Sequence, residues 1–371
     1  MNNPSVCFLL SRFAAGGLER VQTHIAAGFA NTGINIEVVA RAVEIEACSL
    51  FRPEVPVREL GGGRFCFVYR LLRWLHKVRP NVIITSANDI GCLVLLLRRL
   101  LWKDSKIIWT QHLSISGPLR SANTTRRIRL FFEKVMMRYL VRHADSVVAV
   151  TRSVADDMRR TLDPNLSIRV IYNPVIDQYF DTRSKEEINW PWEPSETPVV
   201  IFVGRLARVK RLDLLLQAFS LCIKKTPIKL LIVGEGPERG MAEKLAKELC
   251  LGASCQFIGH SDNPLPWIRQ ADILVLCSDS EGFGLVLVEA MGCGTQIVAT
   301  DCPDGPAEIL EGGRYGRLVP VDNAVELAAA MQEALHSPLA AEAELMARAA
   351  EFSVDGAVTQ YLDLIDQLTR K

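Results

Sequence analysis

The sequence predicts an α/β fold made of two doubly wound parallel-sheet domains. Short apolar runs rich in β-branched residues alternate with longer segments of helical periodicity, which is typical of βα units, and this pattern occurs twice along the chain. The length of 371 residues also favours two domains, because single hydrophobic cores stop growing at about 250 to 300 residues. The composition, 49% hydrophobic and 23% charged, excludes collagen-like and wholly disordered chains.

The first series of units predicts strands at residues 6–10, 36–40, 82–85, 106–110, 146–150 and 168–171. The second series predicts strands at residues 199–203, 229–233, 256–258, 273–276 and 297–299. Between them, residues 189–198 contain three prolines, which break helices and cannot donate to a strand ladder. We therefore expect domains over residues 1–190 and 191–352. Ligands should bind in a cleft between them, at the carboxyl ends of the strands.

Charge is distributed unevenly. Residues 1–190 carry 27 basic and 17 acidic side chains, whereas the remainder carries 16 and 25. Residues 126–142 predict a cationic helix that also holds many apolar residues. Such a helix either lies on an anionic inner-membrane leaflet or packs in the core with its Arg side chains reaching solvent. Nucleic acid is a poorer partner, because the aromatic residues are not arranged as stacking platforms.

Cysteine usage indicates a reducing compartment. The ten cysteines include no C-x-x-C pair and several lie in apolar runs, which suits small buried hydrophobes better than disulfides or a zinc site. We therefore expect a cytoplasmic protein, peripheral to the inner membrane if the cationic helix binds lipid. The first ten residues lack the basic flank of a signal peptide, and no apolar run is long enough to span a bilayer.

The first motif is a glycine turn after the first predicted strand. Gly16 and Gly17 come directly before an amphipathic helix. Glycine lets the backbone approach a ligand closely, and a helix N-terminus favours an anion such as phosphate. A plain tight turn is the alternative, because the dinucleotide fingerprint G-x-G-x-x-G is absent.

The second motif opens the second domain. Gly204 and Arg205 follow the strand at 199–203, and Arg208, Lys210 and Arg211 come next, before a helix. Cations oppose the positive end of a helix dipole, so an anionic ligand is expected nearby. The planar fork of Arg205 and the point charge of Lys210 suit a diphosphate.

The third motif is a glycine-rich turn after the strand at 273–276. Glu281 precedes the predicted helix and Glu289 lies about two turns within it, so both carboxylates can face one elongated ligand. The N–H groups of Phe283, Gly284 and Leu285 have no intrahelical partners and could bind an oxyanion. The alternative is that Glu281 only caps the helix and Glu289 is a surface acid, although a carboxylate on so apolar a helix needs a partner.

These three motifs occur in the order found in the retaining GT-B glycosyltransferases of family 4, which the chain resembles over nearly its whole length. The resemblance implies that the glycine loop of Gly16 and Gly17 approaches the donor diphosphate and the acceptor. Arg205 and Lys210 would neutralise the diphosphate. Glu281 would bind sugar hydroxyls, and Glu289 the ribose. It also implies that residues 353–371 form a helix that returns to pack on the first domain.

Other positions match the family less closely. His112 follows the strand at 106–110, where the family usually has a His beside the donor sugar, but Leu113 replaces the usual Asp or Gly. Ile258 ends the strand predicted at 256–258 and His260 follows it, where the family's loop lies along the nucleotide base. The segment 172–175 resembles the interdomain loop and is expected to shape a hinge.

The resemblance implies a metal-independent glycosyltransferase without a resident cofactor. Its co-substrate would be a nucleotide-sugar, with a UDP-hexose favoured and GDP as the alternative, and its acceptor a cell-envelope glycan or lipid-linked glycan. We expect Glu281, His112, Arg205 and Lys210 to serve catalysis, with preorganised charge stabilising the leaving phosphate.

Two other classes stay open. A GT-B phosphorylase or nucleotide-sugar epimerase shares the architecture, but the lysine signature of pyridoxal phosphate chemistry is missing. A non-catalytic scaffold of polysaccharide assembly is the second, and the intact charged motifs argue against it.

Overall fold

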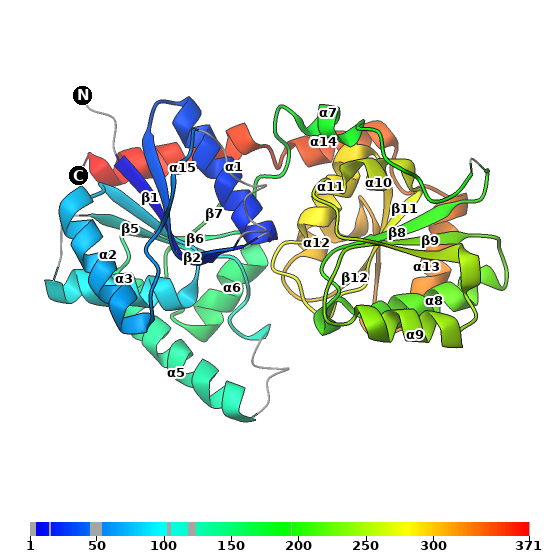
Figure 1. The fold of residues 1–371 in the computed structure, drawn as a ribbon, viewed down its shortest axis with the longest axis horizontal. Helices are drawn as coiled ribbons and strands as arrows, with labels where there is room; N and C mark the ends of the chain where they lie inside the picture. Colours follow the sequence, from blue (N-terminus) through cyan, green and yellow to red (C-terminus); the bar gives the residue numbers. More distant parts are fainter. Residues whose placement is uncertain are drawn as a thin grey trace. The chain divides into compact units, whose positions relative to one another are not determined.

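The computed structural model describes residues 5–14, 16–44, 54–101, 105–117, 124–193 and 195–370. The chain divides into two compact units (Figure 1). Unit 1 comprises Met1–Val175 and Val354–Lys371, and unit 2 comprises Ile176–Ser353. Both are parallel sheets covered by helices on both faces, which confirms the predicted α/β class.

The sheet of unit 1 has the strand order β3-β2-β1-β4-β5-β6-β7, with all pairs parallel. Its strands are β1 (Ser5–Phe13), β2 (Asn35–Val43), β3 (Val57–Glu59), β4 (Val82–Thr85), β5 (Lys106–Gln111), β6 (Ser146–Ala149) and β7 (Ile168–Val170). The sequence analysis missed β3, because three residues with two charged side chains at a sheet edge leave no apolar run to recognise.

Two groups of helices cover this sheet (Figure 1). On one face lie α2 (Arg64–Val78), α3 (Asn88–Leu101), α5 (Thr124–Leu140) and α6 (Arg152–Thr161), around a core that includes Leu71, Trp109 and Met158. On the other face lie α1 (Gly17–Asn31) and α15 (Val354–Thr369). Gly28 lets α1 approach α15, since an added Cβ would lie 2.3 Å from Val358 Cγ2. The Tyr361 ring meets Phe29 edge-on at 6.3 Å.

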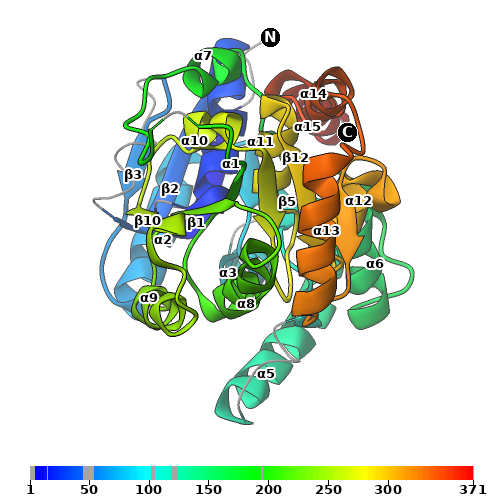
Figure 2. The ribbon, with the colours of Figure 1, turned by 90° about the vertical axis from the view of Figure 1, so that its right-hand side faces the viewer.

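The sheet of unit 2 has the order β10-β9-β8-β11-β12-β13, again parallel throughout. Figure 2 turns the molecule so that the strands β10 and β12 of this sheet face the viewer. Its strands are β8 (Val199–Val203), β9 (Lys229–Val233), β10 (Cys255–Gly259), β11 (Ile273–Leu276), β12 (Gln296–Thr300) and β13 (Arg317–Val319). The strand β13 was not predicted, because it has only three residues and begins with a charged side chain.

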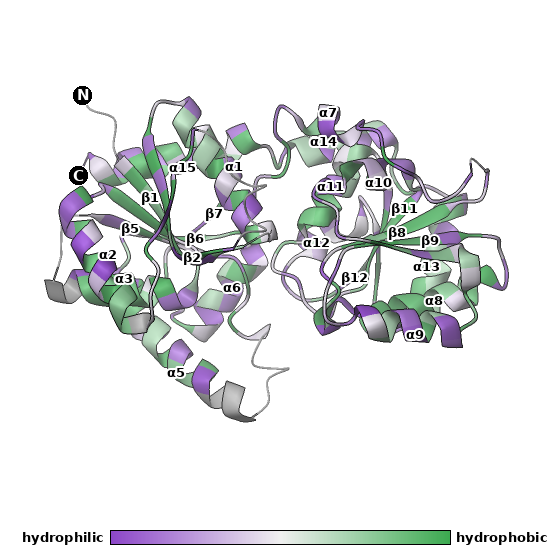
Figure 3. Cartoon of the chain, in the orientation of Figure 1, coloured by the Kyte–Doolittle hydropathy of each residue, from purple (hydrophilic) through white to green (hydrophobic). Residues whose placement is uncertain are grey.

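Helices cover both faces of the second sheet as well. One face carries α8 (Leu212–Ile223), α9 (Arg239–Glu248) and α13 (Ala324–His336). The other carries α7 (Phe180–Ser184), α10 (Leu265–Gln270), α11 (Leu285–Cys293) and α14 (Glu342–Ala350), and α12 (Pro306–Ile309) follows β12. The strands are strongly apolar, whereas polar residues gather on the outer sides of the helices (Figure 3). This is the pattern of a parallel sheet buried on both faces.

The unit boundary lies at Val175, not at residue 190 as the proline-rich segment suggested. Residues after Val175 already pack in unit 2. The Ile176 N–H donates to the Phe352 carbonyl oxygen at 3.2 Å, and the Phe180 ring lies against Gly292 of α11. The rings of Trp190 and Trp267 stack, with their centroids 5.9 Å apart. The prolines therefore mark a loop within unit 2.

Among the described residues, no helix is both long enough and apolar enough to cross a membrane. Nine of the ten cysteines lie in the described ranges and are free thiols; Cys48 lies outside those ranges.

Candidate functional site

A polar cluster of unit 2 lies where two neighbouring strands end. β8 and β11 are adjacent in the sheet, with Ile273 paired to Val200. The loop after β8 carries Lys210, and the loop after β11 carries Glu281. Because both strands run parallel, these loops leave the same edge of the sheet, where ligands bind in open α/β folds.

Lys210 and Glu281 form an ion pair across these loops. Lys210 Nζ lies 2.5 Å from Glu281 Oε1, and the side chains are only 21% and 12% exposed. Ser278 Oγ donates to the same carboxylate oxygen at 2.6 Å. Both bonds end on Oε1, which leaves Oε2 available to accept from a ligand hydroxyl. Ser278 was not predicted as a site residue, because its only signal is its place two residues after a buried strand.

Arg205 supplies a second cation in the loop after β8. Its side chain is exposed, and within the described ranges it forms no hydrogen bond or ion pair. The preceding Gly204 has φ of 155°, and Gly234 packs so closely on it that an added Cβ would lie 1.9 Å from the Gly204 carbonyl oxygen. Such tight backbone packing fixes where the loop leaves β8 and presents Arg205 to solvent.

The start of α11 offers backbone donors beside this pair of loops. Gly284 adopts a left-handed conformation with φ of 84°, which glycine takes without strain, and Leu285 begins the helix. The N–H groups of Gly284 and Leu285 form no backbone hydrogen bond within the described ranges. Phe283 is buried and meets Phe352 edge-on at 5.7 Å, so it anchors the turn. Glu289 lies inside α11 and is only 6% exposed, so it is not a surface acid.

Ile258 and His260 lie at the end of β10, the edge strand, with β9 between it and β8. Ile258 is half-buried. His260 is exposed, and its Nε2 lies 3.3 Å from Asp262 Oδ1. The structure thus places them farther along the sheet edge than the Lys210–Glu281 pair.

In unit 1, the glycine turn begins α1 as the motif predicts. Gly16 is the N-cap with extended backbone, and the Glu19 carboxylate folds back over it, so an added Cβ would lie 2.5 Å from Glu19 Oε2. Gly17 is exposed. Burial is the main cause that raises the pKa of Glu19, although backbone hydrogen bonds oppose it.

His112 follows β5 and is half-buried. Burial lowers its pKa to about 4, and the side chain of Asn173 acts in the opposite direction to a smaller extent. Both ring nitrogens are shielded from solvent, and neither has a partner with good hydrogen-bond geometry in the described part of the chain. The ring is therefore neutral at pH 7 and has hydrogen-bonding capacity left unused. Asn173, expected only to shape a hinge, is buried beside it.

Further polar side chains of unit 1 are buried without partners among the described residues, and three of them are Thr85, Ser86 and Gln22. Thr85 and Ser86 lie at the end of β4, next to β5 in the sheet, and Gln22 lies on the second turn of α1. Gln22 is 1% exposed. Buried polar groups are usually hydrogen-bonded, so these atoms mark places where a ligand could complete the bonding. The sequence analysis missed all three, because nothing local distinguishes them from core or turn residues.

Within the ranges that the structure describes, no three His, Cys, Asp or Glu side chains are grouped to hold a metal ion.

Comparison with known proteins assigns this architecture to a class. Residues 15–179 match the family described as Glycosyltransferase Family 4, and residues 184–352 match Glycosyl transferases group 1. Anabaena HepE in complex with UDP-glucose has the same fold, with a TM-score of 0.80 at 17% identity, covering 98% of this chain and 100% of that chain. The fold is GT-B, that of two-domain glycosyltransferases.

Curated relatives agree with this assignment. The D-inositol 3-phosphate glycosyltransferase of Rhodococcus jostii is 31% identical over 383 residues, covering 94% of this chain and 84% of that protein. N-acetyl-alpha-D-glucosaminyl L-malate synthase of Bacillus anthracis is 30% identical over 194 residues, covering 52% of this chain and 51% of that protein. The chain thus spans about half the length of several curated relatives. Others are named for lipopolysaccharide core and amylovoran biosynthesis. The chain belongs to glycosyltransferase family 4.

The buried His112 predicts a specific pH dependence of stability. Its pKa falls from 6.5 to about 4 on folding, so between these values the unfolded chain binds more protons. The contribution of neutral His112 to the free energy of unfolding is therefore complete above pH 6.5 and is lost as pH falls toward 4. We expect His112→Gln to reduce the loss of unfolding free energy between pH 7 and pH 4.5 by about 1–3 kcal/mol. Urea titrations at both pH values measure this.

The matched control is His76→Gln, which changes an exposed His on α2. This variant should show the same pH dependence of the unfolding free energy as the wild-type protein. The account of His112 fails if the two variants show the same pH dependence.

Proposed function

We propose that the protein is a retaining glycosyltransferase that moves a hexose from a nucleotide-diphosphate sugar, UDP-hexose first and GDP-hexose second, to a cell-envelope glycan or lipid-linked acceptor. The observation that carries this proposal is the cation arrangement after β8. Lys210 is held by Glu281, while Arg205 in the same loop has an exposed guanidinium with no protein partner in the described ranges. An Arg fork and a Lys point charge together suit a diphosphate.

The diphosphate would bind with the amides at the start of α11. The N–H groups of Gly284 and Leu285 can donate to phosphate oxygens, and the positive end of the helix dipole adds to their effect. Glu281 Oε2 would accept from a sugar hydroxyl, and the buried Glu289 would accept from the ribose. Phosphate binding to Lys210 would compete with Glu281, so donor binding would release part of this carboxylate's bonding capacity for the sugar.

In this mechanism the transfer of the sugar depends on stabilising the charge of the leaving group and not on a covalent nucleophile of the enzyme. The bond between the anomeric carbon and the phosphate oxygen breaks, and the acceptor hydroxyl oxygen forms the new bond on the same face. The hydroxyl proton passes to the leaving phosphate oxygen. Arg205, Lys210 and the two amides would stabilise the charge that develops on this oxygen, and preorganised donors of this kind contribute several kcal/mol. Neutral His112 would hydrogen-bond the sugar rather than act as a cation.

The donor and acceptor classes are supported by relatives. UDP-glucose is bound by Anabaena HepE, which shares the fold. Names drawn from lipopolysaccharide and amylovoran biosynthesis favour an envelope glycan. The buried, unpartnered Gln22 and Ser86 of unit 1 offer amide and hydroxyl groups to a polyhydroxylated acceptor.

Peripheral binding to an anionic inner-membrane surface from the cytoplasm, also part of this proposal, is supported by α5. Its outward stripe is apolar: Phe131 is 58% exposed, Phe132 67% and Tyr139 54%. Arg129 and Arg138 are exposed on the same helix. One side of α5 packs in the core of unit 1 through Met137 and Leu140, whereas these three rings lie on its exposed side. A stripe of aromatic residues flanked by cations suits the interface of an anionic bilayer.

Two substitutions and one treatment test the transfer reaction. We expect Arg205→Ala and Glu281→Ala each to lower kcat/KM for a UDP-hexose by about 10²- to 10³-fold, because each removes a contact to the donor. EDTA should leave the rate unchanged, because the proposed site uses no metal. The control is Lys244→Ala, which removes a charge from α9 whose side chain is 79% exposed.

Saturation-transfer NMR with UDP, GDP and ADP comes before these rates are measured, since it identifies the base and separates an enzyme from a scaffold that binds no nucleotide. Near wild-type transfer by either site variant, or inactivation by EDTA, would contradict the mechanism.

The membrane proposal is tested by vesicle sedimentation. Wild-type protein should bind vesicles containing phosphatidylglycerol at low salt and dissociate at high salt, because the surface attraction is screened. Phe131→Ser with Phe132→Ser should weaken binding by about tenfold, since both rings leave the interface. Met241→Ser with Val325→Ser, which removes two exposed apolar residues of unit 2, is the control. Absence of wild-type binding at low salt would overturn the proposal.

A further inference from the structure

Arg211 occupies a backbone conformation that usually selects glycine. It lies between Lys210 and the first residue of α8, with φ of 51° and ψ of 50°. A side chain in this left-handed region crowds the backbone, so a non-glycine residue persists there only when its surroundings hold it. Its side chain makes enough contacts to do so.

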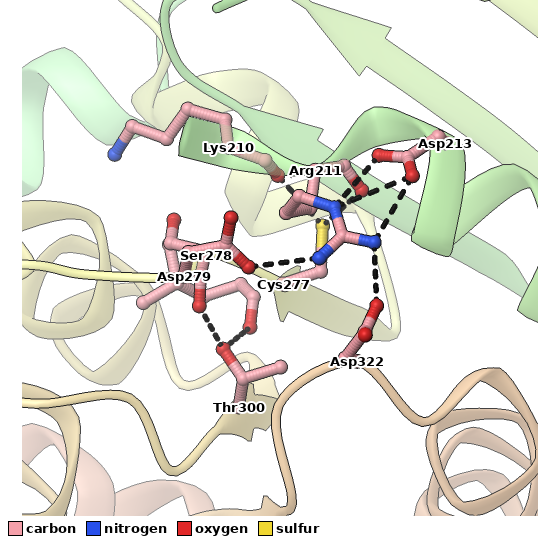
Figure 4. A network of polar contacts seen from close by, with 9 residues as sticks. Lys210, Arg211, Asp213, Cys277, Ser278, Asp279, Thr300 and Asp322 are labelled. Atoms are coloured by element: carbon pink, nitrogen blue, oxygen red, sulfur yellow. Dashed lines mark hydrogen bonds and ion pairs between the residues drawn. The ribbon is translucent and has the colours of Figure 1, made fainter. Parts of the chain in front are cut away.

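The guanidinium of Arg211 contacts three carboxylates from three different segments (Figure 4). Nε donates to Asp213 Oδ1 at 3.1 Å, and Nη2 donates to Asp213 Oδ2 at 3.1 Å. Nη1 donates to Asp279 Oδ1 at 2.9 Å, and Nη2 donates to Asp322 Oδ1 at 2.7 Å. The side chain is 19% exposed, although its partners are largely exposed.

These bonds leave Arg211 little capacity to bind a ligand directly. Nε, Nη1 and both N–H groups of Nη2 are occupied, which is four of the five donors of a guanidinium. Its positive charge is also offset by three acids. Arg211 therefore differs from Arg205, which has no such partners.

The same region ties two loops together through the backbone. The Asp279 N–H donates to the Val209 carbonyl oxygen at 2.9 Å. The Cys277 thiol donates to the carbonyl oxygens of Lys210 at 3.0 Å and Arg211 at 3.3 Å. Thr300 Oγ1 donates to the Ser278 carbonyl oxygen at 2.7 Å, which links this loop to the end of β12. The loop after β8 and the loop after β11 thus form one connected structure.

We propose that Arg211 is a positioning residue: by binding Asp279 and Asp322 it holds the Lys210 loop against the Glu281 loop and sets the separation of those two side chains. Lys210 is its neighbour in the chain, and Glu281 lies two residues beyond Asp279. The Lys210 and Arg211 side chains leave the turn in different directions (Figure 4), so Arg211 acts on Lys210 through the backbone. The consequence for donor binding rests on the proposed function, whereas the tie between the loops does not.

Arg211→Gly removes the guanidinium and keeps the backbone conformation, so it tests the role of the side chain alone. Glycine adopts the left-handed region freely, so the turn keeps its shape while the ties to Asp279 and Asp322 are lost. We expect a melting temperature within a few degrees of the wild type. We also expect Lys210 in the unliganded variant to react about three- to tenfold faster in reductive methylation, because its pairing with Glu281 loosens. Peptide mass spectrometry measures this rate.

In the same variant, KM for the UDP-hexose should rise about tenfold, since small displacements of positioned groups weaken donor contacts, while KM for the acceptor stays unchanged. Arg211→Lys should raise this donor KM by less than Arg211→Gly does. The lysine ammonium can reach one of the two carboxylates but not both. Arg79→Gly is the control. Arg79 belongs to unit 1 and has φ of 47° at the end of α2.

The outcomes separate this inference from the proposed function. If wild-type protein binds no nucleotide, the proposed function fails, and the Lys210 labelling rate still tests the tie. If Arg211→Gly and Arg79→Gly show the same labelling rate and the same donor KM, Arg211 only fills its turn and the inference is wrong. A fall in melting temperature with unchanged labelling at Lys210 would contradict it too.

Discussion

The ion pair between Lys210 and Glu281 is the interaction on which the proposed donor site of unit 2 depends. It joins loops that follow adjacent strands, and both side chains are largely removed from water. Desolvation makes such pairs weak sources of stability, and breaking one leaves a costly unpaired charge. A protein retains this arrangement more readily where a ligand uses it. In the proposed function, a diphosphate would offer Lys210 a second anionic partner, so the pair would be charged and oriented before this ligand arrives.

Most of the fold could be predicted from local sequence, and the exceptions have physical causes. Buried parallel strands are continuous apolar runs, so β4, β8, β9 and β11 have the predicted bounds. The short edge strands β3 and β13 carry too little apolar sequence to be recognised. The unit boundary was misplaced because prolines report only local backbone restriction. The contacts of Ile176 and Phe180 with unit 2 are tertiary and leave no such signal.

The candidate site was predictable where its chemistry follows one strand. Glycines and charged residues after β8 and β11 show in the sequence, so Arg205, Lys210 and Glu281 could be named before the fold was known. What the sequence could not show is how many partners each side chain has. The sequence alone does not distinguish Arg205 from Arg211. In the structure, the Arg205 guanidinium is exposed to solvent, whereas the Arg211 guanidinium binds three carboxylates. Likewise, the orientation of the apolar stripe on α5 depends on what the helix packs against.

The most direct test of the donor site compares UDP with UMP by isothermal titration calorimetry, because the two differ only in the β-phosphate that Arg205 and Lys210 are proposed to hold. The account predicts that wild-type protein binds UDP at least about tenfold more tightly than UMP, and that Arg205→Ala combined with Lys210→Met abolishes this preference. Equal affinities in the wild type, or a preference for UDP that survives in the double variant, would contradict it.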